Sequence, residues 1–355
     1  MHKFSLYLCK LQVIAVIFFK MLTRFLKIDF PVIMAPMFLV SNKDMLKAGM
    51  RAGIMVNFPT LNYRKEGELA ALLDELNDYY KQFPAGNYGV NLIVQKTNPF
   101  YKKHLEICVE KKVPFYITSL GNPVEVIERA HSYGAKVFSD VTNVPHAKKC
   151  ADNGVDGFIA VGQGAGGHAG PNPLQVLIPA LKKYFPDKPI VAAGGIATGS
   201  GLLSVKALGA DGASIGTRFI ASKECHVNEA YKQAILHAGM DDIVMTTKLS
   251  GTPCTIINTP EAKKMGYTQS WLEKFMSNNP QTKRWFKTMV QVRGMKKLEE
   301  SVLPDNYKKL WCAGKSSELI TEILSCEEII TRIKEEYAKK LSEIAKEAGS
   351  LNEND

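Results

Sequence analysis

The fold is decided by one stretch, residues 158–170, which reads Phe158-Ile159-Ala160-Val161-Gly162-Gln163-Gly164-Ala165-Gly166-Gly167-His168-Ala169-Gly170. Its four leading apolar residues are typical of a buried strand, and five glycines follow within nine residues. A glycine-rich backbone can lie flat against a large ligand. His168 stands among small residues rather than on an apolar face, which favours a functional histidine over a plain turn with an incidental one.

Seven further apolar runs resemble the one that leads into this loop, and each is followed by a helical pattern or a loop and helix. The eight runs are residues 31–37, 53–58, 88–94, 114–119, 135–139, 156–161, 189–193 and 211–215. Strands that alternate with helices at regular spacing indicate an α/β fold with parallel strands. We therefore predict a (β/α)8 TIM barrel over residues 21–258.

The main alternative fold is an open doubly wound sheet. Residues 162–167 satisfy the dinucleotide fingerprint GxGxxG, which favours this alternative. However, the match follows the sixth strand rather than the first, and Pro171 and Pro173 prevent a helix from starting at the last glycine. We therefore reject the dinucleotide-binding interpretation.

The predicted barrel fold implies a phosphate-binding site. In such barrels the loops after strands seven and eight commonly hold a phosphate group through backbone N–H groups. Here those loops are Gly194-Gly195-Ile196 and Gly216-Thr217-Arg218. Their glycines let the backbone approach a ligand, Thr217 adds a hydroxyl, and Arg218 is a candidate cation.

The remaining segments differ from the barrel pattern. Residues 248–255 are expected to form a loop, and residues 259–315 a helical cap over the barrel mouth. Residues 316–355 are expected as a C-terminal helix and polar tail. The cap prediction rests on four aromatic residues at helical spacing, Trp271, Phe275, Trp285 and Phe286.

Residues 1–20 are interpreted as a non-native or leader extension. Their apolar run, residues 11–19, lies between Lys10 and Lys20 and is too short to span a bilayer, so we expect no stable membrane insertion. Met21 is favoured as the native start, and a membrane-associating leader is the alternative.

Composition narrows the class of protein. The chain has 355 residues, is 46% hydrophobic and carries a formal net charge of +10. The positive charges are dispersed along polar helix faces, which argues against nucleic acid as a partner. Seven cysteines are scattered without a Cys-x-x-Cys pair or a Cys/His ligand spacing. This pattern predicts a reducing, cytoplasmic location and no metal site.

At this point the chain resembles the nitronate monooxygenase family, formerly called 2-nitropropane dioxygenases. These are FMN-dependent barrels related to the flavin enoyl-ACP reductases. The resemblance extends from residue 21 to about residue 337. It rests on residues 31–37, 89–91, 165–168, 193–196, 209–212, 216–219 and 311–314, in that order along the chain.

The resemblance implies a role for each matching residue. His168 is the implied active-site base, and the loop glycines around it are expected to make room for the isoalloxazine and substrate. The implied flavin contacts are Ala35, Pro36, Met37, Asn91, Gly166, Gly167, Ala193, Gly194, Gly195, Gly216 and Thr217. Among these, residues 35–37 are expected against the isoalloxazine, Asn91 as a hydrogen-bond partner, and residues 194, 195, 216 and 217 at the FMN phosphate.

The implied activity is oxidation of an alkyl nitronate or nitroalkane by dioxygen to a carbonyl compound and nitrite. An NAD(P)H-dependent flavin reductase of enoyl-thioesters or quinones is the alternative within the same fold. A non-catalytic flavin-binding protein is the alternative from another class, and a homodimer is a candidate assembly. The chain departs from many family members at Gly164, Val161 and Thr255, and from one group at Asp140, which leaves the substrate open.

Overall fold

Eight parallel strands form a closed barrel in the order β1-β2-β3-β4-β5-β6-β8-β9. This computed structural model describes residues 21–95, 98–249, 252–268, 289–290, 293, 299–300 and 310–351. The barrel strands are β1 (Val32–Met34), β2 (Met55–Pro59), β3 (Asn87–Ile93), β4 (Phe115–Ser119), β5 (Lys136–Val141), β6 (Gly157–Val161), β8 (Ile190–Ala193) and β9 (Gly212–Ile215). All eight predicted strands are present, which confirms the TIM barrel.

Helices follow the strands and cover the outside of the barrel. They are α2 (Lys43–Arg51), α3 (Glu68–Gln82), α4 (Tyr101–Glu110), α5 (Val124–His131), α6 (Val144–Asp152), α7 (Leu174–Tyr184) and α8 (Gly199–Ala207). The short α9 (Thr217–Ile220) follows β9 directly, at the C-terminal end of the barrel. Local sequence fixes several starts. The side chain of Asn42 caps α2 by accepting from the backbone N–H groups of Asp44 and Met45, and Thr198 caps α8 in the same manner.

The barrel interior and the helix layer form separate cores because side chains alternate along each strand. Ile33, Met55, Phe138 and Val191 belong to the interior core, and the next residues along the strands face the helices. A helix over residues 21–26 contributes Leu22 to the interior core. A Cβ added at Gly212 would lie 2.5 Å from the Leu22 side chain, so this helix packs closely against the N-terminal end of β9.

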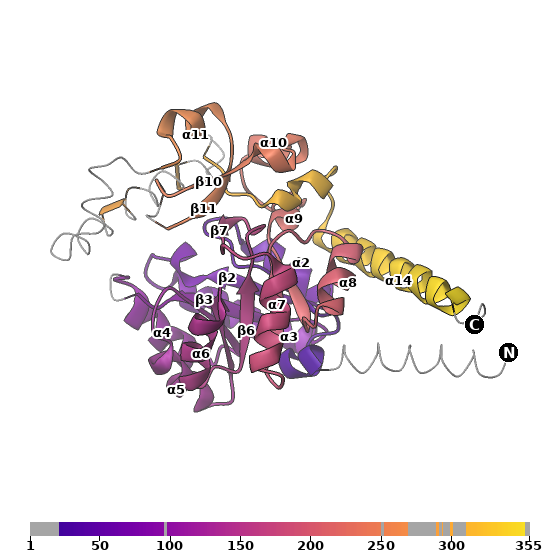
Figure 1. Cartoon of the computed structure of the whole chain (residues 1–355). Coiled ribbons are helices and arrows are strands. Elements are labelled where there is room, and N and C mark those ends of the chain that lie inside the picture. The colour runs from indigo at the N-terminus through magenta and orange to yellow at the C-terminus, as the bar shows by residue number, and fades with distance from the viewer. Residues whose placement is uncertain are drawn as a thin grey trace.

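A small antiparallel sheet, absent from the sequence prediction, lies over the other end of the barrel. Its strands are β10 (Ile243–Thr246), β11 (Cys254–Ile257) and β7 (Gly167–His168), in the order β10-β11-β7. Figure 1 shows this sheet with α10 (Glu229–His237) and α11 (Pro260–Met265) above the barrel. The expectation of a loop throughout residues 248–255 is therefore wrong at its end, where β11 begins.

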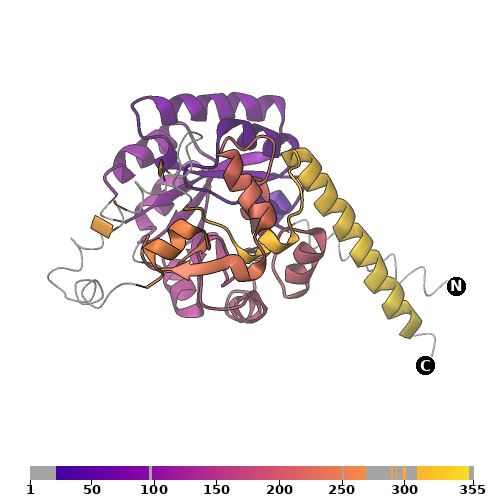
Figure 2. The same cartoon turned by 90° about the horizontal axis from the view of Figure 1, so that it is seen from above.

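The last described element is α14 (Cys326–Leu351), a helix whose first part packs against α8 and α2 and whose C-terminal part projects away from the barrel (Figure 2). Gly199 permits this contact, since an added Cβ would lie 2.2 Å from the backbone nitrogen of Tyr337. No helix among the described residues is long and apolar enough to cross a bilayer. The four cap aromatics and residues 1–20 lie outside the described ranges.

Candidate active site

A cavity of about 630 Å³ opens at the end of the barrel that the small sheet covers. This volume lies within the range of small-molecule and cofactor sites. Every site residue that the family resemblance implies lines it, namely Ala35, Pro36, Met37, Asn91, Gly166, Gly167, His168, Ala193, Gly194, Gly195, Gly216 and Thr217. The cavity lies at the C-terminal ends of the strands, where TIM barrels carry their active sites.

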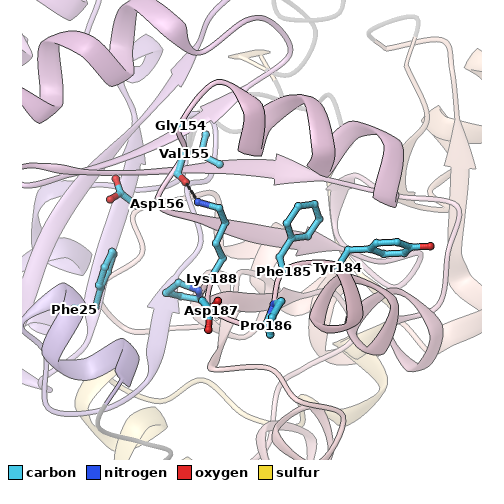
Figure 3. A pocket seen from close by; sticks show the side chains of 10 residues that line it. Phe25, Gly154, Val155, Asp156, Tyr184, Phe185, Pro186, Asp187 and Lys188 are labelled. Atoms are coloured by element: carbon cyan, nitrogen blue, oxygen red, sulfur yellow. Dashed lines mark hydrogen bonds between the residues drawn. The ribbon is translucent and has the colours of Figure 1, made fainter.

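A second cavity of about 440 Å³ lies at the opposite end of the barrel. Its walls come from the loops that enter β6 and β8, together with Phe25 (Figure 3). Lys188 donates a hydrogen bond to the carbonyl oxygen of Val155 across it, at 2.7 Å. No residue predicted for the site lies there, so we assign the chemistry to the larger cavity.

His168 reaches the large cavity from β7, where it pairs with Cys254 of β11. Its backbone is therefore held by the small sheet rather than by a free loop. The imidazole is accessible through the cavity, while the surrounding protein desolvates it and lowers its pKa below the ordinary value. A neutral imidazole at physiological pH is suited to accept a proton.

At most glycines of the loop before His168, an added side chain would meet neighbouring protein atoms. A Cβ added at Gly164 would lie 3.1 Å from the backbone nitrogen of Gly195, and one at Gly166 would lie 2.8 Å from that of Gly314. At Gly167, by contrast, an added Cβ meets nothing within 4 Å. The lack of a side chain at Gly164 and Gly166 therefore permits close backbone packing, while both residues still border the cavity, and the expectation that the glycines make room for the isoalloxazine and substrate stays a prediction.

Thr255, a residue of the small sheet, stabilises the glycine loop before His168 through hydrogen bonds. The buried Thr255 hydroxyl donates to the carbonyl oxygen of Ala165 at 2.5 Å and lies 3.3 Å from that of Gly167. From the barrel side, the backbone nitrogen of Gly195 donates to the carbonyl oxygen of Gly164 at 3.1 Å. The loop is thus fixed between the barrel and the small sheet, which preorganises the backbone that carries His168.

The two loops predicted for phosphate both border the cavity. Gly194 and Gly195 adopt positive φ angles of 119° and 74°, which favour glycine. Thr217 accepts a hydrogen bond from the backbone nitrogen of Gly314 at 3.0 Å. Arg218 is not a cavity residue: it is buried and donates to the carbonyl oxygen of Glu322 at 2.9 Å. Its interpretation as a ligand cation is therefore wrong.

A buried polar chain crosses the cavity floor. The side-chain amide of Asn91 donates to the carbonyl oxygen of Ile117 at 3.1 Å and to the hydroxyl of Ser119 at 2.7 Å. Ser119 in turn donates to the carboxyl of Asp140 at 2.5 Å. These bonds use both amide protons of Asn91, so its carbonyl oxygen is the group left to accept from a ligand.

Sequence reasoning missed several cavity residues. His146, from α6, and Asp140, from β5, both line the cavity, and burial lowers the pKa of His146 and raises that of Asp140 to about 6. Asn62, which is not a lining residue, stabilises residues 37–41 by donating to the carbonyl oxygens of Met37 and Ser41, both at 3.2 Å. Only Asp140 gave a sequence signal, as a departure from the family pattern.

No group of three or more potential metal ligands occurs among the residues that the structure describes.

Comparisons with known proteins agree with this geometry. The family model described as nitronate monooxygenase matches residues 64–336. A Mycobacterium tuberculosis (3aS,4S,5R,7aS)-5-hydroxy-7a-methyl-1-oxo-octahydro-1H-indene-4-carboxyl-CoA dehydrogenase is 28% identical, with the alignment covering 69% of this chain and 67% of that enzyme. A probable nitronate monooxygenase of Staphylococcus aureus is 25% identical, with 74% and 84% covered.

A solved structure of FabK from Thermotoga maritima superposes with a TM-score of 0.77 at 29% identity. That superposition covers 91% of this chain and 97% of the FabK chain. Because the family model spans more than three quarters of the sequence, the match includes most of the barrel and the whole of the glycine loop. The chain belongs to the nitronate monooxygenase family and is a flavin-dependent oxidoreductase.

Proposed function

We propose that the chain is an FMN-dependent nitronate monooxygenase that converts alkyl nitronates to a carbonyl compound and nitrite with dioxygen. One observation carries the proposal. A histidine with a lowered pKa enters a cavity whose other walls are the two phosphate-type loops, residues 35–37 and Asn91. A proton acceptor and a flavin-sized binding surface are thereby joined in one place.

The residues present fit a flavin mononucleotide. Gly194 and Gly195 turn their backbone at one side of the cavity, and Thr217 stands at the start of α9 beside them. A Cβ added at Gly216 would point towards Ala35 and Met37, at 3.5 and 3.7 Å, so the missing side chain leaves room on the cavity side. Residues 194, 195, 216 and 217 would hold the phosphate, residues 35–37 would lie against the ring, and Asn91 would accept from it.

The protein's own groups supply placement and proton transfer. When bound, the flavin accepts electrons from the substrate and passes them to dioxygen. His168 takes the α-proton of a neutral nitroalkane on its imidazole, or orients a nitronate that is already ionised. Thr255 and the small sheet hold the His168 backbone, and the cavity walls limit the access of bulk water to the reacting atoms.

Nitrite release tests this role. His168→Ala is expected to retain bound flavin and to lose turnover of neutral nitropropane by about 100-fold or more, the usual contribution of a general base. Turnover of propyl nitronate, which His168 only orients, is expected to fall much less. His146→Ala, which removes the other described histidine of the same cavity, is the matched control and is expected to retain both activities. Unchanged turnover of neutral nitropropane in His168→Ala removes this histidine from the mechanism.

The identity of the cofactor is tested separately. Heat denaturation followed by chromatography of the released flavin is expected to give FMN in a ratio close to one per chain. Release of FAD, or of no flavin, contradicts the assignment of the phosphate loops.

The second candidate function is hydride exchange between NAD(P)H and a coenzyme A thioester or related substrate. It is favoured by the M. tuberculosis relative, which is a dehydrogenase of a carboxyl-CoA compound and is more similar in sequence than the S. aureus protein. The two candidates are separated by the choice of reductant.

A further inference from the structure

Two cysteines that are 58 residues apart in the sequence meet in the cavity wall. The Sγ atoms of Cys254 and Cys312 are 3.9 Å apart, and both residues line the large cavity. The other described cysteines, Cys108, Cys150, Cys225 and Cys326, are buried elsewhere and do not line it. The pair therefore combines close sulfurs with access from the cavity.

The backbone around the pair explains why the sulfurs face each other. Ile256 forms an antiparallel bridge with Cys312, and the backbone nitrogen of Ile257 donates to the carbonyl oxygen of Trp311 at 2.8 Å. Residues 254 and 256 lie on the same face of β11 because side chains alternate along a strand. Cys254 is thus the diagonal neighbour of Cys312 across this bridge, within reach of its side chain.

We propose that Cys254 and Cys312 form a redox-active dithiol, which hydrogen peroxide entering the cavity oxidises to a disulfide. The Cys312 thiolate attacks one peroxide oxygen, the O–O bond breaks, and a sulfenic acid forms. The released hydroxide takes the proton that Cys312 gave up and becomes water. Cys254 then attacks the sulfenic sulfur, the S–O bond breaks, and its thiol proton leaves with the hydroxyl as a second water. The two electrons lost by the sulfurs reduce the peroxide.

The two cysteines differ in exposure and in pKa, and these differences determine which one reacts first with peroxide. Cys254 is only 5% exposed, whereas Cys312 is more accessible. The side-chain contact between the two sulfurs lowers the pKa of Cys312 and raises that of Cys254, which favours the thiolate on the more accessible Cys312. Since the thiolate is the nucleophile, Cys312 reacts first and Cys254 resolves the sulfenic acid.

A disulfide between Cys254 and Cys312 would affect the large cavity because each cysteine is close to a residue that lines it. Cys254 is the sheet partner of His168, and Gly314, two residues after Cys312, donates to the Thr217 hydroxyl at 3.0 Å. A disulfide requires sulfurs about 2.05 Å apart, so the pair must close by roughly 2 Å. This closure draws the segment around Cys312 towards β11 and shifts the Gly314 contact with Thr217.

Peptide mapping tests the proposal on the flavin-loaded protein. The protein is reduced with dithiothreitol, freed of it, treated with an equimolar amount of hydrogen peroxide, and alkylated. A digest without reductant is expected to contain the peptides of Cys254 and Cys312 as one linked species, which dithiothreitol separates. If both cysteines are recovered as alkylated free thiols, or if either is linked to another cysteine, the proposal is overturned.

Matched variants separate the roles of the two thiols. In Cys254→Ser, dimedone is expected to trap a sulfenic acid on Cys312, and in Cys312→Ser no sulfenic acid is expected on Cys254. Cys225→Ser, a buried cysteine outside the cavity, is the control and is expected to form the link as the wild type does. Trapping on Cys254 rather than Cys312 contradicts the assigned order. The wild-type peptide map decides the main proposal even if a serine variant fails to fold.

Flavin fluorescence provides a further readout that does not depend on activity. Peroxide is expected to change the fluorescence of the wild type and of Cys225→Ser, and dithiothreitol to restore it, whereas Cys254→Ser does not show this reversible change. Formation of the link without a change in fluorescence overturns the connection between the dithiol and the flavin-binding loops.

Discussion

Asp140 provides a pH-dependent test of the buried polar chain on the cavity floor. Its carboxyl lies on β5, accepts from Ser119 and borders the cavity. Burial raises the pKa of Asp140 from 3.8 to about 6, although the Ser119 hydrogen bond opposes the shift. The folded protein therefore binds this proton more tightly than the unfolded chain does.

The sign of the effect follows from this difference. The stability that the protonated carboxyl contributes is fully present below pH 3.8 and is lost as the pH rises through about 6. Each pKa unit corresponds to about 1.36 kcal/mol. The shift sets an upper limit of about 3 kcal/mol, and solvent that reaches the carboxyl through the cavity reduces the expected effect to between about 1 and 3 kcal/mol.

Asp140→Asn removes the titration and retains an oxygen that can accept from Ser119. We expect the unfolding free energy of this variant, relative to wild type, to rise by about 1 to 3 kcal/mol between pH 4 and pH 7. Denaturant unfolding at several pH values measures this difference. Asp187→Asn, at an exposed aspartate, is the control and is expected to follow the wild-type curve. A constant or falling difference for Asp140→Asn refutes the reasoning.

Three further predictions concern helix packing, the flavin site and the base. Gly199→Ala places a Cβ 2.2 Å from the Tyr337 nitrogen and should lower the free energy of unfolding by about 1 to 3 kcal/mol, as measured by denaturant unfolding. Gly201→Ala on the same helix should lower it less, because the nearest atom to the added Cβ is 3.3 Å away. An equal decrease in the two variants contradicts the packing of α14 against Gly199. Gly216→Asp should abolish flavin binding through charge and bulk, whereas Gly216→Ala should retain it, as measured by the ratio of flavin to protein absorbance. Stoichiometric flavin in Gly216→Asp refutes the placement of the flavin phosphate at this loop. Because desolvation lowers the pKa of His168, kcat/KM for neutral nitroalkanes should rise with pH through an apparent pKa below 6.5, and a midpoint above 6.5 argues against this base.

The barrel was predictable because each strand carries a local signal. The apolar run before the glycine loop and its seven counterparts agree with the observed strands to within a few residues. The position of the loop after β6 also placed His168 at the mouth of the barrel, since all parallel strands end there.

The rest depended on contacts between distant parts of the chain. β7 has only two residues, Gly167 and His168, and therefore shows no periodicity; it is a strand because β11 pairs with it. The packing role of Gly166 depends on Gly314, and the direction of Arg218 depends on Glu322. These residues are visible in the sequence, but the partners that determine their roles lie far away along the chain and become neighbours only in the folded protein.

Oxidation of nitronates in this cavity is the function that we propose. Its most direct test is to mix the purified flavoprotein under anaerobic conditions with propyl nitronate or with NAD(P)H and to follow the flavin absorbance. We expect fast bleaching by propyl nitronate and a much slower response to NAD(P)H. Fast bleaching by NADH or NADPH, with no response to the nitronate, contradicts it and favours the reductase.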